Sequence, residues 1–105
     1  EKLQGSTGGF YDPPRSTPTA TRSEALLSAY KLAVYSKTNS KTDQILKILD
    51  RAIAFELHTQ ITDKNSRAFG AFGNTLADHT VRIDYVQHNI SAMLGYMKIL
   101  IENGY

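Results

Sequence analysis

Three stretches of the chain repeat apolar residues at intervals of three and four, and this spacing decides the fold class. Residues that recur at this period lie on one face of an α-helix, so each stretch predicts an amphipathic helix. The predicted helices cover residues 22–37, 42–61 and 80–102. The only strand candidate, AFGAF at 68–72, is short and rich in glycine. The sequence therefore predicts an all-α fold of three main helices arranged in antiparallel hairpins.

Each predicted helix has boundary signals and an apolar face. The T-x-x-E spacing of Thr21 and Glu24 predicts a capping box at the start of the first helix. Gly104 suits the left-handed position that follows the last helix. The predicted core faces are Leu26, Leu27, Tyr30, Ala33 and Val34 in the first helix, Ile45, Ile48, Leu49, Ala52 and Ile53 in the second, and Val86, Ile90, Met93, Met97 and Leu100, extended by Leu94 and Ile101, in the third.

The segments outside these helices differ in composition. All three prolines and three of the seven glycines lie in residues 1–19. This favours an extended arm over residues 1–20 and a helical domain over residues 21–105. Phe10 and Tyr11 indicate that the arm docks on another surface, because disordered tails tend to lack aromatic residues. A connection as long as residues 62–79 is uncommon in a compact domain and is often functional.

Composition excludes several classes of function. The chain has no cysteine, which rules out disulfides, thiolate chemistry and cysteine-based metal sites. The net charge is only +2 and the basic residues are scattered, so nucleic acid is an unlikely partner. No apolar run approaches the roughly 20 residues that cross a bilayer, so no membrane contact is expected. No phosphate-binding loop or cofactor motif is present, and no cofactor is predicted.

Two segments of the chain resemble each other. GGF at 8–10 and GAF at 70–72 each precede a polar loop and a helix, with a period close to 60. Placing Phe10 on Phe72 brings Arg22 opposite Arg82, with a slip of two residues in the loop. This period fits one helical hairpin with its connecting loops.

The segments GGFYDPPRSTPTATRSEAL and GAFGNTLADHTVRIDYVQHNISAMLGY resemble the α/α-toroid proteins. That group includes terpene-cyclase and prenyltransferase-like rings, six-hairpin glycosidases and sugar epimerases. The resemblance implies that the chain is part of a helical ring, or assembles with copies of itself, and that its loops line a cavity. The acidic repeat, the zinc ligands and a clear carboxylate pair of those families are missing. A small free-standing bundle is the alternative architecture.

The segment VRIDYVQH holds the candidate catalytic residues. Asp84 and His88 lie at i and i+4 on one helix face, where a carboxylate can orient an imidazole for general-base chemistry. Glu24 is the second candidate carboxylate. The alternative is that Asp84 pairs with His88 or with Arg82 on a solvated helix start.

Arginine and aromatic residues form the candidate binding set. Arg22 and Arg82, with Tyr11 and Tyr85, would bind a carbohydrate-like polar ligand. The alternative is that the loop aromatics, Phe10 and Phe72 among them, only anchor the loops on the core.

The remaining histidines and Glu56 are weaker candidates. Glu56 and His58 lie two residues apart, so at most one of them faces the core. The three histidines match no known ligand spacing, and no metal site is predicted.

Together these observations predict a helical interaction or assembly module without catalysis of its own. Its expected partner is a second copy of the chain or another protein. The alternative is part of an α/α-toroid protein that binds or processes a carbohydrate-like substrate. The sequence does not assign a cellular compartment.

Overall fold

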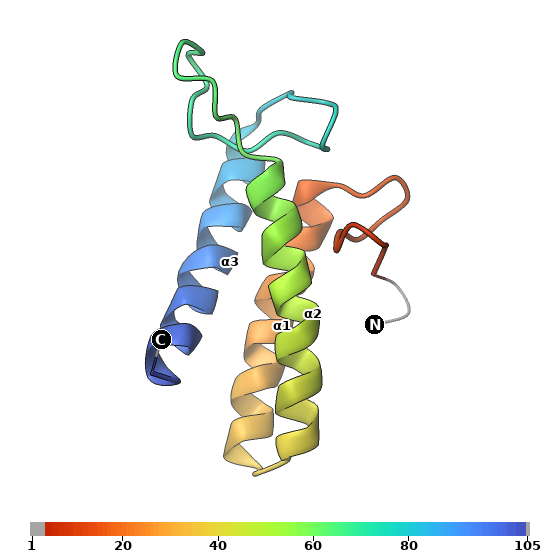
Figure 1. Ribbon diagram of the computed structural model, residues 1–105, viewed down its shortest axis with the longest axis vertical. Helices are drawn as coiled ribbons and strands as arrows, with labels where there is room; N and C mark the ends of the chain where they lie inside the picture. The colour runs from red at the N-terminus through yellow and green to blue at the C-terminus, as the bar shows by residue number, and fades with distance from the viewer. Residues whose placement is uncertain (1–3, 105) are drawn as a thin grey trace.

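The protein folds into three helices that stand side by side. The computed structural model describes residues 4–104, with α1 at Ser16–Tyr35, α2 at Asn39–His58 and α3 at Ile83–Glu102 (Figure 1). α1 and α2 form an antiparallel hairpin, and α3 runs in the same direction as α1. Residues 4–104 contain isolated β-bridges but no strand. The predicted all-α class is therefore confirmed.

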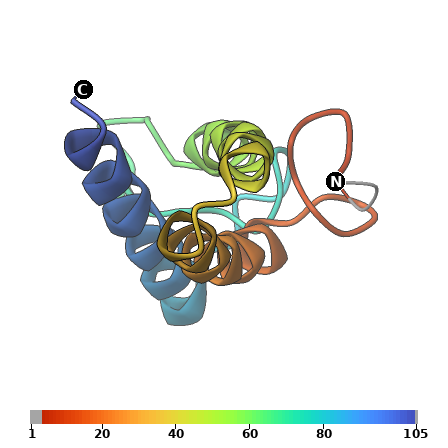
Figure 2. The ribbon, with the colours of Figure 1, turned by 90° about the horizontal axis from the view of Figure 1, so that it is seen from below.

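α1 is the central helix. It packs against both α2 and α3, whereas α2 and α3 contact each other little (Figure 2). Its buried face changes along its length, from small residues at the N-terminal end to Leu27 and Tyr30 further on. The core consists of three clusters of buried residues. They are Leu27, Tyr30, Leu49 and Ile99; Phe10, Ile48 and Ala52; and Ala20, Ile53 and Ala92.

The start of α1 differs from the prediction. The helix begins at Ser16, not at residue 22, and Pro18 is its third residue. Proline is tolerated there because the first turn has no intrahelical acceptors for its N–H groups. Thr21 lies inside the helix, where its hydroxyl donates to the carbonyls of Thr17 and Pro18. The predicted capping box is therefore wrong.

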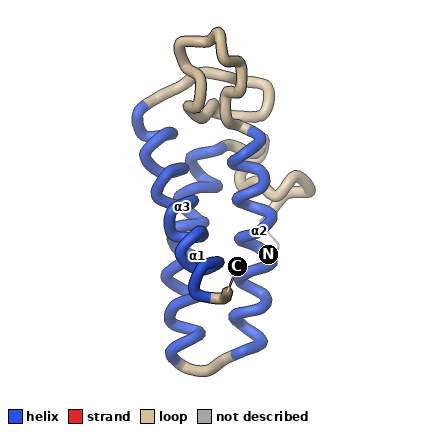
Figure 3. The backbone as a smooth tube through the Cα atoms, turned by 60° about the vertical axis from the view of Figure 1, so that its left-hand side comes forward, coloured by secondary structure: helices blue, strands red, loops and turns tan. Residues whose placement is uncertain are grey.

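The loop between α2 and α3 supplies the missing cap. The Ser16 N–H donates to the Asn74 carbonyl at 2.7 Å, and the Ser16 hydroxyl donates to the Gly73 carbonyl at 2.6 Å. The loop spans residues 59–82, somewhat more than predicted, and lies over one end of the bundle (Figure 3). Buried Phe72 forms a bridge with Gln60 and anchors it. The loop thus ties the end of α2 to the start of α1.

The N-terminal arm docks on α2, so the prediction that it docks on another surface is confirmed. The Gln4 side chain donates to the Ile48 carbonyl at 2.9 Å, and the Arg51 guanidinium donates to the Gly5 carbonyl at 2.9 Å. Phe10 is buried, and its N–H donates to the Thr19 hydroxyl at 2.8 Å. The arm is shorter than predicted and forms turns, because residues 16–20 belong to α1.

The predicted apolar face of α2 is confirmed, whereas that of α3 is correct only in part, since Met93 packs against the core. Ile48, Leu49, Ala52 and Ile53 of α2 are buried as expected. In α3 the buried residues are Asn89, Ala92 and Ile99. The predicted core residues Ile90, Leu94, Met97 and Ile101 are exposed, so Met97 is not core filler.

Close packing on α1 explains which face of α3 is buried. Ala92 is fully buried in a cluster with Ala20 of α1. A Cβ atom added at Gly95 would lie 2.5 Å from Leu27 Cδ1. The small residues Ala92 and Gly95 therefore face α1 together with Ile99, while Ile90, Leu94, Met97 and Ile101 face outward.

Replacing Gly8 by alanine tests the docking of the arm. Gly8 has φ +94°, and an added Cβ would lie 2.1 Å from the Arg51 carbonyl oxygen. Gly70 has φ +87° with no atom within 4 Å, so Gly70→Ala is the matched control for backbone strain alone. In urea unfolding, Gly8→Ala should lower the free energy of unfolding by about 2–4 kcal/mol and Gly70→Ala by about 1 kcal/mol. Equal losses would contradict tight docking on α2.

Candidate functional site

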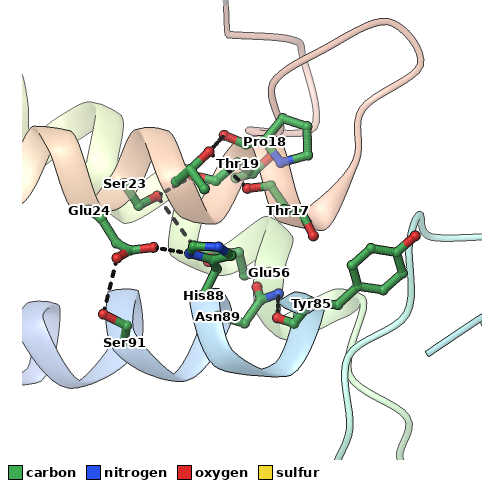
Figure 4. Close-up of polar contacts among 11 residues, drawn as sticks. Thr17, Pro18, Thr19, Ser23, Glu24, Glu56, Tyr85, His88, Asn89 and Ser91 are labelled. Atoms are coloured by element: carbon green, nitrogen blue, oxygen red, sulfur yellow. Dashed lines mark hydrogen bonds and ion pairs between the residues drawn. The ribbon is translucent and has the colours of Figure 1, made fainter. Parts of the chain in front are cut away.

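Polar side chains from all three helices meet at the N-terminal halves of α1 and α3 (Figure 4). This polar cluster has an outer part at the surface and an inner part that is buried. Its members are Ser23 and Glu24 of α1, Glu56 of α2, and His88, Asn89 and Ser91 of α3.

The outer part of the polar cluster links α1 to α3. His88 Nδ1 lies 2.7 Å from Glu24 Oε1, and both side chains are 33% exposed. The Ser91 hydroxyl donates to Glu24 Oε2 at 3.2 Å. Both oxygens of the Glu24 carboxylate are thus engaged by residues of α3.

Asp84 and His88, predicted to act together, have different partners. Asp84 Oδ1 lies 3.6 Å from Arg82 Nε, and both side chains are at least half exposed. The structure therefore favours the alternative in which Asp84 pairs with Arg82 on a solvated helix start. His88 is joined instead to Glu24, the second candidate carboxylate.

Glu56 occupies the inner part of the polar cluster and is fully buried. Burial raises the pKa of Glu56 from 4.5 to about 8; the Ser23 hydrogen bond opposes this change and the nearby Glu24 charge adds to it. The Ser23 hydroxyl lies 3.4 Å from Glu56 Oε2. Glu56 is therefore mainly protonated at neutral pH, because burial in an apolar medium disfavours the charged form. Its neighbour His58 is exposed, which confirms that only one of these two residues faces the core.

Several buried polar atoms at this end have no hydrogen-bond partner among the described residues. They are Thr17 Oγ1, Glu56 Oε1 and Asn89 Oδ1. Asn89 does donate through its side-chain nitrogen to the Tyr85 carbonyl at 2.6 Å. An unsatisfied buried polar group costs about 1–3 kcal/mol. This part of the core is therefore held less favourably than the aliphatic clusters.

Of the predicted binding residues, Arg82 and Tyr85 lie together at the start of α3, whereas Arg22 lies in α1 and Tyr11 in the arm. The Arg22 guanidinium lies 5.4 Å from the centre of the Phe10 ring, and that of Arg82 lies 5.9 Å from the centre of the Tyr85 ring. Tyr11 is exposed in the arm and is covered by Arg15 at 4.6 Å. Phe10 and Phe72 are buried, which agrees with the alternative that they anchor loops.

The proposed alignment of the two similar segments does not match the helix starts. Arg82 is the N-cap residue of α3, whereas Arg22 lies in the second turn of α1. The N-cap residue of α1 is Arg15, which has the same extended backbone as Arg82.

A second candidate site is the outward side of α3. Its large aliphatic residues are strongly exposed, and we refer to them together as the outer α3 face. They are Ile83 (86% exposed), Ile90 (45%), Leu94 (60%), Met97 (53%) and Ile101 (63%). An open pocket of about 480 Å³, lined by Val81, Arg82, Ile83, Val86 and Gln87, adjoins its N-terminal end.

Neither site carries the marks of a metal centre or a membrane span. Within residues 4–104, no three His, Cys, Asp or Glu side chains gather in a way that could hold a metal ion. Among the same residues, no helix combines the length and apolarity needed to traverse a bilayer. Comparison of the chain with protein-family models, curated proteins and solved structures finds no match.

Sequence reasoning missed the inner residues Ser23 and Asn89 and the outer residue Ser91. Asn89 was detectable as a polar residue three positions before Ala92 on the face with the smallest side chains. Glu56 was detectable because it follows Leu49 and Ile53 at helical spacing within the apolar run AIAFEL. Ser91 has no such signal, since its role depends on a residue 67 positions away.

The raised pKa of Glu56 predicts that stability falls as pH increases. Between pH 4.5 and about 8 the unfolded chain loses the Glu56 proton while the folded chain keeps it. Folding is therefore favoured below this window and progressively disfavoured within it. Glu56→Gln, which stays neutral, should remove this decline and raise the free energy of unfolding at pH 8 by up to several kcal/mol. Urea unfolding of both proteins at pH values from 4.5 to 8.5 measures this change in the free energy of unfolding.

The exposed Glu102→Gln variant is the control for removing one acidic residue. It should reproduce the pH profile of the unaltered protein. A Glu56→Gln profile parallel to that of the unaltered protein would show that Glu56 is ionised in the fold.

Proposed function

We propose that the protein is a helical assembly module that binds another protein through the outer α3 face and catalyses no reaction of its own. The observation that carries this proposal is the exposure of the five large aliphatic side chains of that face. Contiguous apolar patches on protein surfaces commonly mark interaction sites.

The energetics support association through this face. Full burial of one large aliphatic side chain contributes about 1.5–3 kcal/mol. Burial of five such side chains can therefore offset much of the free-energy cost of the translational and rotational entropy that two molecules lose when they associate. A helix with two apolar sides buries both only if another element packs on each side. α1 covers one side of α3, and the outer α3 face is the other.

The polar cluster supports the same function by holding α3 in place. Glu24 receives contacts from both His88 and Ser91, and these contacts join α1 to α3 at the surface. The Tyr96 hydroxyl donates to Asp50 and joins α3 to α2. A helix fixed in this way loses little conformational freedom on binding, which favours affinity.

Removing the apolar side chains tests the proposal. The double variant Leu94→Ser with Met97→Ser should bind more weakly to a hydrophobic-interaction resin while unfolding in urea within about 0.5 kcal/mol of the unaltered protein. Leu57→Ser, at a residue of α2 that is 51% exposed, is the matched control and should keep its retention.

The opposite result is equally clear. If the double variant loses about 2–5 kcal/mol of stability at a protein concentration where the unaltered chain is monomeric, as expected for aliphatic residues in a core, the outer α3 face belongs to the folded chain itself. The assembly proposal would then be wrong.

A second candidate function is binding of a carbohydrate-like polar ligand, with His88, Glu24 and Asp84 in acid–base roles. The pair of His88 and Glu24 favours it, because this pair is partly exposed and held by two helices. Titration with cellotetraose or maltotetraose, followed by NMR, should then shift the signals of Glu24 and His88. His88→Ala should abolish the shifts, and the exposed His58→Ala control should retain them. Unchanged spectra would reject this function.

A further inference from the structure

The exposed aliphatic residues of α3 follow the spacing of a coiled-coil seam. Ile83, Ile90 and Met97 lie seven residues apart. Gln87, Leu94 and Ile101 also lie seven apart and are offset by four from the first set. Alternating intervals of four and three define the a and d positions of a heptad, with Gln87 as the one polar member. The seam runs along the whole helix, a length of about 30 Å.

The seam points away from the protein's own core. In the same heptad, Ala92 and Ile99 take the position opposite the seam, and they are 0% and 2% exposed. Gly95, on the same inner side, contacts Leu27 of α1. The residues of the seam are therefore free to pack against a helix of another molecule.

The charges of α3 specify which helix fits. Arg82 and Asp84 lie at its N-terminal end, and Lys98 and Glu102 lie at its C-terminal end. An antiparallel second copy places Ile83 against Ile101 and Ile90 against Leu94. This register brings Asp84 beside Lys98 of the other copy, and both residues lie at positions that flank the seam. The twofold axis makes this favourable pair occur twice.

A parallel copy lacks this complementarity. In a parallel pair each residue lies at the same level as the identical residue of the other copy. Asp84 therefore lies near the second Asp84, and Lys98 lies near the second Lys98. Charges along the edges of a coiled coil set the orientation of its helices. The antiparallel arrangement is the one that places Asp84 beside Lys98.

We propose that the outer α3 face binds a second copy of this chain, and that the two α3 helices pair antiparallel about a twofold axis near Ser91. This inference rests on the proposed function and names its partner. Each copy keeps its own α1 and α2 on the inner side of α3.

A charge exchange tests both the partner and its orientation. Sedimentation equilibrium of the full chain, from about 1 µM to about 1 mM, should show a reversible monomer–dimer equilibrium. Asp84→Lys and Lys98→Asp alone each place like charges together twice per dimer and should weaken dimerisation about tenfold. The two substitutions combined should restore it. Lys47→Asp, an exposed charge reversal on α2, is the control and should have no effect.

A thiol introduced at the twofold axis gives an independent readout. The chain contains no cysteine, so Ser91→Cys introduces its only thiol. In the antiparallel pair the two introduced thiols are neighbours, and mild oxidation should trap a covalent dimer. Asp84→Cys should remain uncrosslinked, because its two copies lie about 24 Å apart along the helices.

The outcomes separate this inference from the proposed function. A monomeric mass at every concentration, or a combined charge variant as weak as its single parents, would overturn the antiparallel second copy. The assembly function would still stand if the Leu94→Ser and Met97→Ser variant remained stable. Loss of stability in that variant, measured at a protein concentration where the unaltered chain is monomeric, would overturn both.

Discussion

The close packing of α3 on α1 determines which surfaces of this protein are free. Ala92 and Gly95 leave no room for a larger side chain on the inner side of α3, as the contact between Gly95 and Leu27 shows. With these residues facing inward, the larger aliphatic side chains at 90, 94, 97 and 101 necessarily face outward. The outer α3 face is thus a consequence of how the core packs. The larger aliphatic residues of this face are exposed because the small residues Ala92 and Gly95 make the contact with α1.

The polar cluster marks the end of the bundle where this packing is least favourable. Glu56 keeps its carboxyl neutral only because burial makes ionisation costly, and one of its oxygens has no hydrogen-bond partner among the described residues. The surface pair of Glu24 and His88 lies directly outside and fastens the same region of α1 and α3. Stability at this end therefore depends on the protonation of a buried acid, whereas the aliphatic clusters do not titrate.

The sequence predicted the features that depend on local periodicity. The number and kind of helices, the core face of α2 and the left-handed Gly104 after α3 all follow from residues close together in the chain. The start of α1 could not be predicted in this way, because Asn74, 58 positions away, accepts the N–H of its first residue. The partner of His88 escaped prediction for the same reason. Glu24 is 64 residues distant, whereas Asp84, the locally attractive partner, binds Arg82.

The wrong part of the prediction for α3 has a different cause, and it bears on function. Periodicity identifies the larger apolar stripe of a helix, and the natural inference is that this stripe is the core. α3 has two apolar sides, and the periodic one with Ile90, Leu94 and Met97 is exposed. One side of such a helix packs into the core of its own chain. The other side carries the exposed heptad seam. A regular seam that contributes nothing to the packing of α1 or α2 is the kind of surface on which a further helix packs, and it supports the proposed pairing.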